Sequence, residues 1–312
     1  MAVLTEEQSM LRDAARTWTQ EKSPVSAFRK MRDSGAPLGY DPAAFNEMAE
    51  MGWTGVIIPE EYGGSDFGYL SLGLVLEELG RTLTASPLLA TALATASALI
   101  LGGSTAQKEA WLPKIAAGEA VGALAVDEGP HHNPEKVAVT AAKSGAGYTL
   151  SGTKTFVLEG MAAAVFVVSA RTSGATGDKD GITLFLVPAD AKGVSRKALK
   201  LADSRGAAVV TFDNVALGAD AVLGEVDKGY PLLEKVLDRA RAGLAAEMLG
   251  SASQAFDTTL DYLKTRVQFG QVIGSFQALQ HRAAKMFTDL ELARSCVEAA
   301  LAAIDADSPE VP

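Results

Sequence analysis

The stretch that decides the fold is Tyr262-Leu-Lys-Thr-Arg-Val-Gln-Phe-Gly-Gln-Val-Ile-Gly-Ser-Phe-Gln-Ala-Leu-Gln280. Apolar residues recur at helical intervals before this stretch, from Leu233 to Leu263, and after it, from Phe276 to Val297. The Phe269-Gly270 pair interrupts the pattern, so the sequence predicts two long helices joined by a tight turn. Such helices bury their apolar faces against partners, and we therefore expect a helical bundle at this end of the chain.

Upstream of this bundle, from about residue 121 to residue 222, short β-rich runs alternate with glycine turns. The segment Gly145-Ala-Gly147 stands between two such runs, Val137–Thr140 and Tyr148–Ser151, and this arrangement is typical of a hairpin. Further apolar runs follow at Ala163–Ala170, Ile182–Val187 and Val209–Phe212. The pattern predicts a β domain of the barrel or sandwich type.

Helix start and stop signals in the sequence predict that the first part of the chain is helical. Thr5 with Gln8, and Ser104 with Gln107, form capping-box patterns, and Asp41-Pro42 is a helix start. We therefore predict an α+β multidomain protein: an all-α domain over 1–119, a β domain over 120–226 and a helical bundle, incomplete, over 227–312. The apolar segment Leu88–Leu101 is half Ala and Thr and too short to cross a bilayer, so we expect a buried helix there.

Composition narrows the class of protein. The chain has 312 residues, 48% of them hydrophobic, and a net charge of −10, which argues against nucleic-acid binding as its main task. A single cysteine, Cys296, excludes an internal disulfide, and the three histidines have no metal-ligand spacing. The first residues lack the basic and apolar regions of a secretory signal, so we expect a cytoplasmic protein that binds neither metal nor membrane.

Four motifs, in order along the chain, resemble the acyl-CoA dehydrogenase superfamily. They are Pro59-Glu-Glu-Tyr-Gly-Gly64, Gly152-x-Lys154-x-Phe-Val-x-x-Gly160, Asp213-Asn-Val215 with Leu223-Gly224, and the Arg-x-x-Phe-Gly turn followed by Phe-Gln-x-x-Gln between the long helices. The resemblance covers essentially the whole chain. It implies a helical N-terminal domain, a middle β-barrel or sandwich domain and a C-terminal helical bundle, with FAD bound between the last two, usually across a subunit interface.

The resemblance assigns cofactor contacts residue by residue. Arg266 and Phe269 would contact the adenine-diphosphate half of an FAD that the neighbouring subunit partly holds, with Gln277 nearby. An Arg offers a permanent planar cation to pyrophosphate and Phe an apolar face, which agrees with these roles. From the residues alone, the alternative is that Arg266 caps the first long helix through a salt bridge and that Phe269 belongs to the core.

In the β domain the match is less regular. Ala125-Val126-Asp127-Glu128 stands where the family often has Thr-Glu-Pro, whose backbone and hydroxyl contact the pyrimidine edge of the flavin; Asp127 replaces the Thr, and Pro130-His-His-Asn-Pro134 replaces Gly-Ser-Asp. Phe156 stands where an aromatic covers the flavin. Leu158 stands where a Thr or Ser bonds near N5, and a Leu cannot do so. For His131 and His132 a solvated loop is the favoured interpretation.

The family reaction is α,β-dehydrogenation of an acyl-CoA thioester, and it needs a carboxylate base. In some members this Glu precedes an Arg that Arg241 matches, but Ala240 occupies the Glu position here. Glu247 lies two turns further on the same helix face. The small residues Ala240, Gly243 and Ser251 form a stripe around it that leaves room for substrate. We predict Glu247 as the base and Asp238 as the second candidate. The substrate-binding residues we predict are Arg241, Gly243 and Ser251.

Other interpretations stay open at this point. The small residues on that stripe also suit a close helix crossing, with Glu247 in an ion pair with a basic side chain such as Arg282. The catalytic base would then lie outside this chain or be missing. Two other functions stay open as well: a non-catalytic partner subunit of a heteromeric dehydrogenase, and a flavin oxidase or monooxygenase on the same fold. As a dehydrogenase of fatty-acid or lipid metabolism, it would work as a homodimer, homotetramer or heterotetramer and pass electrons to an electron-transfer flavoprotein.

Overall fold

The computed structural model describes residues 4–309 and residue 311. Met1, Ala2 and Val3, which belong to the stretch where no secretory signal is expected, lie outside the described residues. The chain divides into two compact units. The helical unit consists of Met1–Phe28, Tyr69–Thr84 and Arg241–Val311, and the mixed unit contains Arg29–Gly68 and Ala85–Ala240. Among the described residues, no helix combines the length and apolar character needed to span a membrane.

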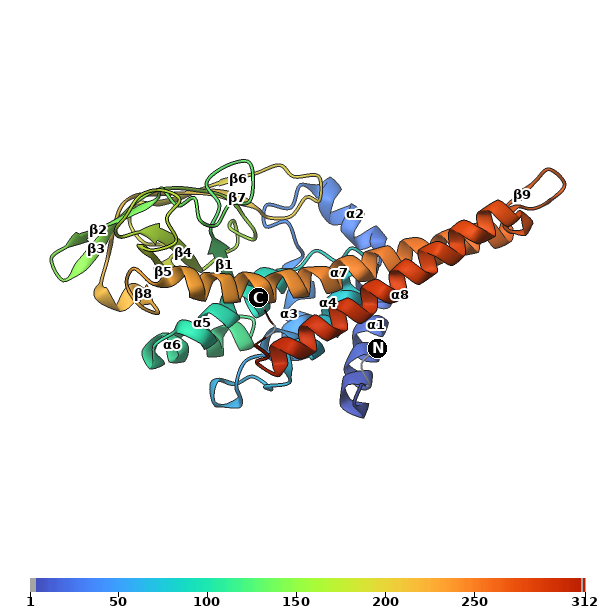
Figure 1. Cartoon of the computed structure of the whole chain (residues 1–312), viewed down its shortest axis with the longest axis horizontal. Coiled ribbons are helices and arrows are strands. Elements are labelled where there is room, and N and C mark those ends of the chain that lie inside the picture. Colours follow the sequence, from blue (N-terminus) through green and yellow to red (C-terminus); the bar gives the residue numbers. More distant parts are fainter. Residues whose placement is uncertain (1–3, 310, 312) are drawn as a thin grey trace. The chain divides into compact units, whose positions relative to one another are not determined.

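The elements follow each other in the predicted order of helices, strands and helices (Figure 1). The α-helices are α1 (Glu6–Lys22), α2 (Val25–Ser34), α3 (Pro42–Glu50), α4 (Gly68–Arg81), α5 (Ala96–Gly102), α6 (Thr105–Ala116), α7 (Gly229–Thr265) and α8 (Gln277–Asp305). The strands are β1 (Gly122–Ala125), β2 (Thr140–Ser144), β3 (Gly147–Val157), β4 (Val165–Arg171), β5 (Ile182–Pro188), β6 (Val194–Ala198), β7 (Ala208–Leu217), β8 (Val222–Leu223), β9 (Val267–Gln268) and β10 (Gln271–Val272). Short helical turns are η1 (Trp53–Gly55), η2 (Glu60–Tyr62), η3 (Leu89–Thr95), η4 (Ala219–Ala221) and η5 (Ile273–Ser275).

Helix α4 is the buried centre of the helical unit, and every one of its residues from Leu70 to Gly80 is buried. Two of them are adjacent carboxylates, which must be paired at this depth. Glu77 accepts a hydrogen bond of 2.7 Å from Arg294 of α8, and Glu78 accepts two from Arg16 of α1 at 2.7 and 3.2 Å. Helix α4 is thereby held to α1 and α8 by ion pairs as well as by apolar packing.

Helices α4 and α7 cross with their backbones in contact. A Cβ atom added to Gly250 of α7 would overlap the carbonyl oxygen of Glu77, and one added to Gly80 of α4 would overlap that of Glu247. The hydroxyl of Ser251 donates a hydrogen bond of 2.9 Å to the Gly80 carbonyl across the same crossing. Of the small residues in the predicted stripe, Ser251 therefore takes part in close helix packing, together with Gly250, which lies outside that stripe.

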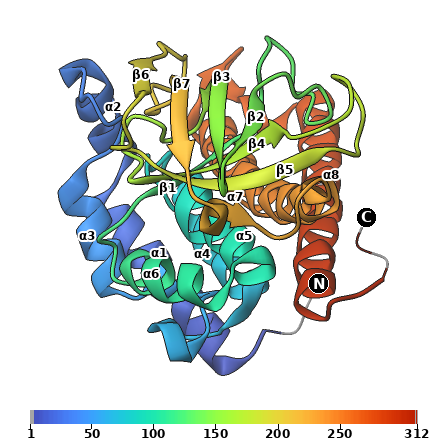
Figure 2. The same cartoon turned by 90° about the vertical axis from the view of Figure 1, so that its left-hand side faces the viewer.

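The mixed unit is built on one mixed sheet with the strand order β6-β7-β3-β2-β4-β5-β8, with β1 pairing in parallel with β4. The sheet curls over its core, because the rings of Phe166 on β4 and Phe212 on β7 lie 6.4 Å apart although β3 and β2 separate these strands in the sheet. Figure 2 shows α5 and α6 below the strands. Gln107 of α6 connects the two layers, since its amide donates to the carbonyls of Asp220 and Val222 at 2.7 and 2.9 Å.

The segment predicted as a buried helix, Leu88–Leu101, is buried, but its first part differs from an α-helix. Leu89–Thr95 forms a π-helix before α5 begins. The Thr95 hydroxyl donates to the carbonyl of Ala90 five residues earlier, at 2.8 Å, which matches the wider π register. Thr91 of the same segment exchanges hydrogen bonds of 3.0 and 3.1 Å with the backbone of Gly122, so the π-helix holds the start of β1.

Lys154 lies on β3 inside the curled sheet and is completely buried. Its ammonium group donates to the Val126 carbonyl at 2.8 Å, to the Glu128 carboxylate at 2.7 Å and to the Ser169 hydroxyl at 3.0 Å. Burial lowers the pKa of Lys154 from 10.5 to about 8, although Glu128 opposes the shift. One lysine therefore connects β3 to β4 and to the segment that follows β1.

The predicted architecture is confirmed: a helical N-terminal part, a middle β-sheet domain and a C-terminal helical part. Both capping boxes form as predicted, and so does the helix start at Asp41, whose side chain accepts from the Ala43 amide. Strand β2 begins only at Thr140, since the Glu128 carboxylate accepts the amide hydrogens of Ala138 and Val139. The domain boundaries at 119 and 226 stay predictions.

The crossing of α4 and α7 predicts the effect of Gly250→Ala. Alanine favours a helix over glycine by about 1 kcal/mol. Nevertheless, we expect the free energy of unfolding to fall by about 1–3 kcal/mol, because the new methyl group overlaps the Glu77 backbone. Urea unfolding followed by circular dichroism measures the change. Gly129→Ala is the control, since a Cβ there meets nothing within 4 Å. Equal stability of the two variants would contradict the close crossing.

Burial of Lys154 predicts a pH-dependent stability. Between pH 8 and pH 10.5 the unfolded chain binds a proton that the folded chain has released, so the stability of the wild type rises with pH in this window. One proton contributes a slope of up to about 1.4 kcal/mol per pH unit. Lys154→Met should lack this slope and should lose about 3 kcal/mol at neutral pH, because it leaves Glu128 without its cation.

Urea unfolding of both proteins at several pH values tests this prediction. The variant Lys154→Met/Glu128→Gln removes both charges and is the control for the neutral-pH loss, because no unpaired carboxylate remains. It should recover part of the lost stability. Parallel pH profiles of the wild type and Lys154→Met would show that Lys154 does not titrate in this range.

Candidate functional site

In the mixed unit, a β-bulge in β3 presents the two apolar residues predicted to contact flavin. The pairing of β3 with β7 shifts its register between Lys154 and Val157, and Phe156 within this shift has a left-handed φ of 50°. A bulge changes the direction of side chains, and a left-handed aromatic residue is strained. As a result Phe156 is 45% exposed and Leu158 is 38% exposed, while Val157 between them is buried.

The segment after β1 lies beside this bulge. The Thr155 amide donates to the Asp127 carbonyl at 2.7 Å, and Lys154 donates to the Val126 carbonyl, so β3 holds this segment at two successive carbonyls. Ala125 is fully buried within the core of the sheet. The structure therefore brings together the predicted contacts Ala125, Asp127, Phe156 and Leu158 at one end of the sheet.

The two carboxylates of this segment are both engaged. Glu128 accepts hydrogen bonds from Lys154 and from the amides of Ala138 and Val139. Asp127 accepts from the Asn133 amide at 3.0 Å, and His132 Nδ1 lies 2.9 and 3.1 Å from its two oxygens. His132 is exposed, as expected for a solvated loop, yet its ring has a specific partner.

In the helical unit, the Arg-x-x-Phe-Gly motif forms a tight hairpin turn between β9 and β10. Phe269 and Gly270 both have a positive φ, 54° and 77°, which is the geometry of a type I′ turn. Phe269 is 91% exposed, so the alternative that placed it in the core is wrong. Its ring packs edge-on at 6.1 Å against Phe276, which immediately precedes Gln277, the first residue of α8.

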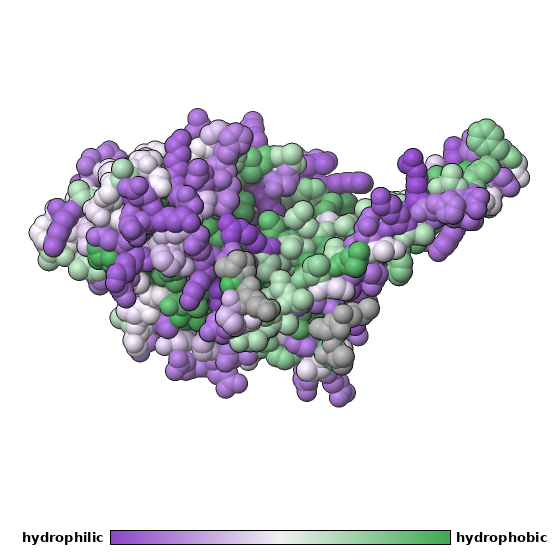
Figure 3. Space-filling view, in the orientation of Figure 1, coloured by the Kyte–Doolittle hydropathy of each residue, from purple (hydrophilic) through white to green (hydrophobic). Residues whose placement is uncertain are grey.

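This turn is the tip of the α7–α8 hairpin, as Figure 1 shows, and Arg266 and Gln277 are exposed there with Phe269. Figure 3 shows hydrophobic surface at the end of the hairpin that carries β9. Further along the hairpin, large apolar side chains are also uncovered: Tyr262, Val267, Met286, Phe287 and Leu292 are between 41% and 62% exposed. The helical unit therefore presents a guanidinium, an amide and apolar surface together.

The candidate base Glu247 is half-buried on α7, at the crossing with α4. Gly243 is buried on the same helix, and Ser251 is half-buried with its hydroxyl bonded to Gly80. Arg241 is exposed. These four residues belong to the helical unit, whereas Asp238, half-buried near the start of α7, belongs to the mixed unit.

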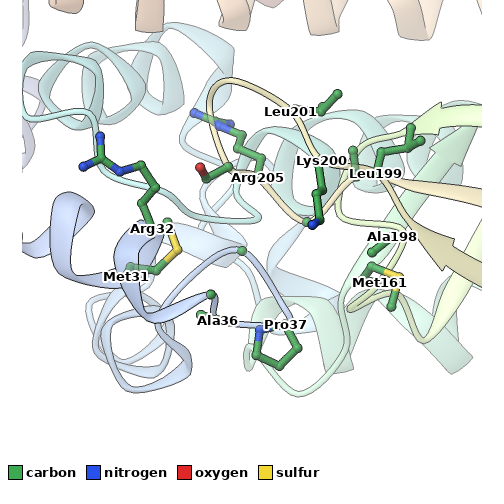
Figure 4. Close-up of a pocket in the computed structure, with 15 residues that line it drawn as sticks. Met31, Arg32, Ala36, Pro37, Met161, Ala198, Leu199, Lys200, Leu201 and Arg205 are labelled. Atoms are coloured by element: carbon green, nitrogen blue, oxygen red, sulfur yellow. The ribbon is translucent and has the colours of Figure 1, made fainter.

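The mixed unit has a surface pocket of about 390 Å³. Figure 4 shows that the end of α2 and the loop after it line one side, and residues 198–207 with Met161 line the other. Arg32, Lys200 and Arg205 are among the lining residues. None of the residues predicted to bind cofactor or substrate lines this pocket.

The sequence alone indicated no role for the side chains of Lys154 and Glu128, and it predicted only a solvated loop for His132. A lysine in the middle of a β-rich run is the signal that marks the first pair, because buried strand positions are otherwise apolar. For His132 the signal is weaker: two prolines, Pro130 and Pro134, restrict the loop that returns it to Asp127.

Comparisons with known proteins give matches along the whole chain. The N-terminal, middle and C-terminal domain models of acyl-CoA dehydrogenase match residues 5–119, 127–215 and 227–312. The short/branched chain specific acyl-CoA dehydrogenase of Bos taurus mitochondria is 32% identical over 316 residues, covering 100% of this chain and 72% of the relative.

Two solved structures are similar over almost the whole chain. Butyryl-CoA dehydrogenase of Megasphaera elsdenii has a TM-score of 0.90 at 29% identity, covering 99% of this chain and 82% of that one. A chain in a structure of the electron transferring flavoprotein of Acidaminococcus fermentans has a TM-score of 0.90 at 30% identity, with the same coverage. The fold, the motifs and these matches together show that the chain belongs to the acyl-CoA dehydrogenase family of flavoprotein oxidoreductases.

Proposed function

We propose that the chain catalyses the FAD-dependent α,β-dehydrogenation of an acyl-CoA thioester to the trans-2-enoyl-CoA. Family membership supports this reaction, and so do relatives named for short, branched and butyryl substrates. The observation that carries the proposal is the bulge in β3, which exposes Phe156 and Leu158 beside the Asp127 backbone. An apolar surface next to fixed polar backbone groups suits a flavin ring.

The residues of each unit fit a part of FAD. The mixed unit offers apolar cover from Phe156 and Leu158 for the ring system. The helical unit offers Arg266 for the pyrophosphate and Phe269 for the adenine-diphosphate half, with Gln277 beside it. When bound, FAD supplies the acceptor for the β hydrogen, which leaves the substrate as hydride.

Glu247 takes the α proton at its carboxylate in this proposal. A carboxylate base is effective when it is partly withdrawn from water, and the half-buried position of Glu247 agrees with this need. Asp238 is the competing base. Arg241 and Gly243 lie on the same helix as Glu247 and are the proposed substrate contacts, whereas the engagement of Ser251 with Gly80 favours a positioning role for its hydroxyl.

We infer that the chain works in an oligomer. The exposed apolar residues of the α7–α8 hairpin and the exposed Arg266 at its tip suit an arrangement in which this tip contacts FAD held by another subunit. A homodimer, a homotetramer and a heterotetramer all satisfy this arrangement. An electron-transfer flavoprotein is the proposed acceptor. The cytoplasmic location stays a prediction, since the Bos taurus relative is mitochondrial.

Ala240 favours one second candidate function. The absence of a carboxylate at the position where some family members have their base suits a non-catalytic partner subunit. Such a chain would copurify with a homologue that carries the base and would be inactive alone. An oxidase or monooxygenase on the same fold would instead consume oxygen during turnover.

Replacing the base tests the proposal directly. Glu247→Gln keeps the shape of the side chain but cannot accept a proton. We expect the variant to retain FAD and to lose about 10²–10⁴-fold in the rate at which an acyl-CoA bleaches the flavin absorbance anaerobically. Stopped-flow absorbance under anaerobic conditions measures this rate.

Asp238→Asn is the matched control for this experiment, because it removes a carboxylate from the same helix. If Asp238→Asn stops the bleaching and Glu247→Gln does not, Asp238 is the base. If the wild type binds FAD but no acyl-CoA bleaches it without a second subunit, the chain is the partner subunit.

The exposed tip of the hairpin predicts a cofactor effect of Arg266→Met. Charge-assisted hydrogen bonds contribute about 1.5–3 kcal/mol each, so we expect FAD affinity to fall by about 10- to 100-fold. Dialysis followed by flavin fluorescence measures the dissociation constant. Lys264→Met removes an exposed cation from the same region of α7 and should leave affinity unchanged. Equal affinity of Arg266→Met and the wild type would remove Arg266 from the cofactor site.

A further inference from the structure

The segment after β1 carries a carboxylate where the family motif has a neutral hydroxyl. In the motif, this position contacts the pyrimidine edge of the flavin, and here Asp127 occupies it. Its carbonyl is fixed by the Thr155 amide, one residue before Phe156. With flavin bound there, this carboxylate would add negative charge where the family motif has a neutral hydroxyl.

The loop that follows provides a partner for this carboxylate. His132 Nδ1 lies 2.9 Å from Asp127 Oδ2 and 3.1 Å from Oδ1, and the Asn133 amide donates to Oδ1 at 3.0 Å. The Asp127 side chain is only 20% exposed, whereas that of His132 is 49% exposed. Two successive loop residues therefore bind one carboxylate, and prolines on both sides restrict the loop.

Other charged groups in this region do not bind this carboxylate directly. Lys154 donates to Glu128 at 2.7 Å, and its charge also acts on Asp127, but without a hydrogen bond to it. Arg171 donates to the backbone carbonyls of Val137, Ser173, Asp178 and Asp180. The remaining titratable groups of the loop are His131, Glu135 and Lys136, and Glu135 pairs with Lys179 at 3.3 Å. His132 is thus the side chain that binds Asp127 directly.

We propose that His132 is a positioning residue that holds the Asp127 carboxylate and compensates its charge beside the flavin. The proposal rests on the proposed function, since it assumes that FAD binds at this end of the sheet. Charge near the pyrimidine ring tunes the reduction potential of a flavin. An uncompensated Asp127 disfavours the reduced flavin, which carries more negative charge than the oxidised form. His132 therefore makes an acidic residue compatible with a flavin that must accept a hydride.

Four variants of the full chain test the proposal through the flavin potential. In His132→Gln, Asp127 loses its imidazole partner, and we expect reduced flavin to bind about tenfold more weakly relative to oxidised flavin. This ratio corresponds to a potential about 30 mV more negative for a two-electron couple. Asp127→Thr restores the hydroxyl of the family motif. In Asp127→Thr/His132→Gln the flavin potential should not fall, because no carboxylate remains. His131→Gln is the matched control and should match the wild type.

Dye-linked anaerobic titration of the FAD-loaded proteins measures these potentials. If His132→Gln merely disrupted the loop, the flavin potential would be as low in the double variant as in His132→Gln. A potential that recovers in the double variant therefore indicates charge compensation and not a loss of loop structure. If His132→Gln keeps the flavin potential of the wild type, the proposal is wrong. It is also wrong if the potential of the double variant is as low as that of His132→Gln.

A second measurement is independent of FAD. In the flavin-free chain at a pH where imidazole is neutral, a hydrogen bond to Asp127 fixes the proton of His132 on Nδ1. Nitrogen NMR should find this tautomer for His132 in the wild type and its loss in Asp127→Thr. If the wild type shows the tautomer but takes up no FAD, the proposed function fails while the contact stands. If His132 lacks the Nδ1 tautomer in the wild type, the proposal itself is overturned.

Discussion

The contact between the backbones of α4 and α7 is the constraint on which the helical unit depends. Glycines at positions 80 and 250 allow it, and the carbonyl oxygens of Glu247 and Glu77 occupy the space that larger residues would need. Because Glu247 lies at this contact, the same packing that stabilises the unit also fixes the helix turn that carries the candidate base. A small shift of α7 along α4 would therefore move the packing contact and the candidate base together.

The mixed unit uses a different device to fix its functional residues. A lysine with three hydrogen-bond acceptors, Lys154, is buried where an apolar residue would cost less. Its contacts hold the segment after β1 against β3 at the point where the bulge begins. The strained backbone of Phe156 therefore directly follows two residues that are fixed by hydrogen bonds, and strain of this kind persists only where the surroundings enforce it.

Local signals in the sequence were sufficient for most of the fold. Capping boxes at Thr5 and Ser104 and the break at Phe269-Gly270 specify their own geometry, because the interacting groups are three or four residues apart. The π-helix at Leu89–Thr95 was not predictable in this way, since its helical period is close to that of an α-helix and Gly122, from a distant strand, packs against it. The pairing of Lys154 with Glu128, and of His132 with Asp127, likewise depends on tertiary contacts.

The stripe of small residues on α7 shows why a candidate site is harder to predict than a fold. Glycine and serine leave room for a substrate and for a neighbouring helix equally well, so the pattern alone does not separate the two uses. The structure assigns Ser251 of the stripe, and the neighbouring Gly250, to the helix crossing. Glu247 is different, because a close crossing requires only its backbone and would be served equally well by an alanine. A carboxylate at this position therefore serves something other than the crossing itself, and the two uses that stay open are the proposed proton abstraction and an ion pair with a basic side chain.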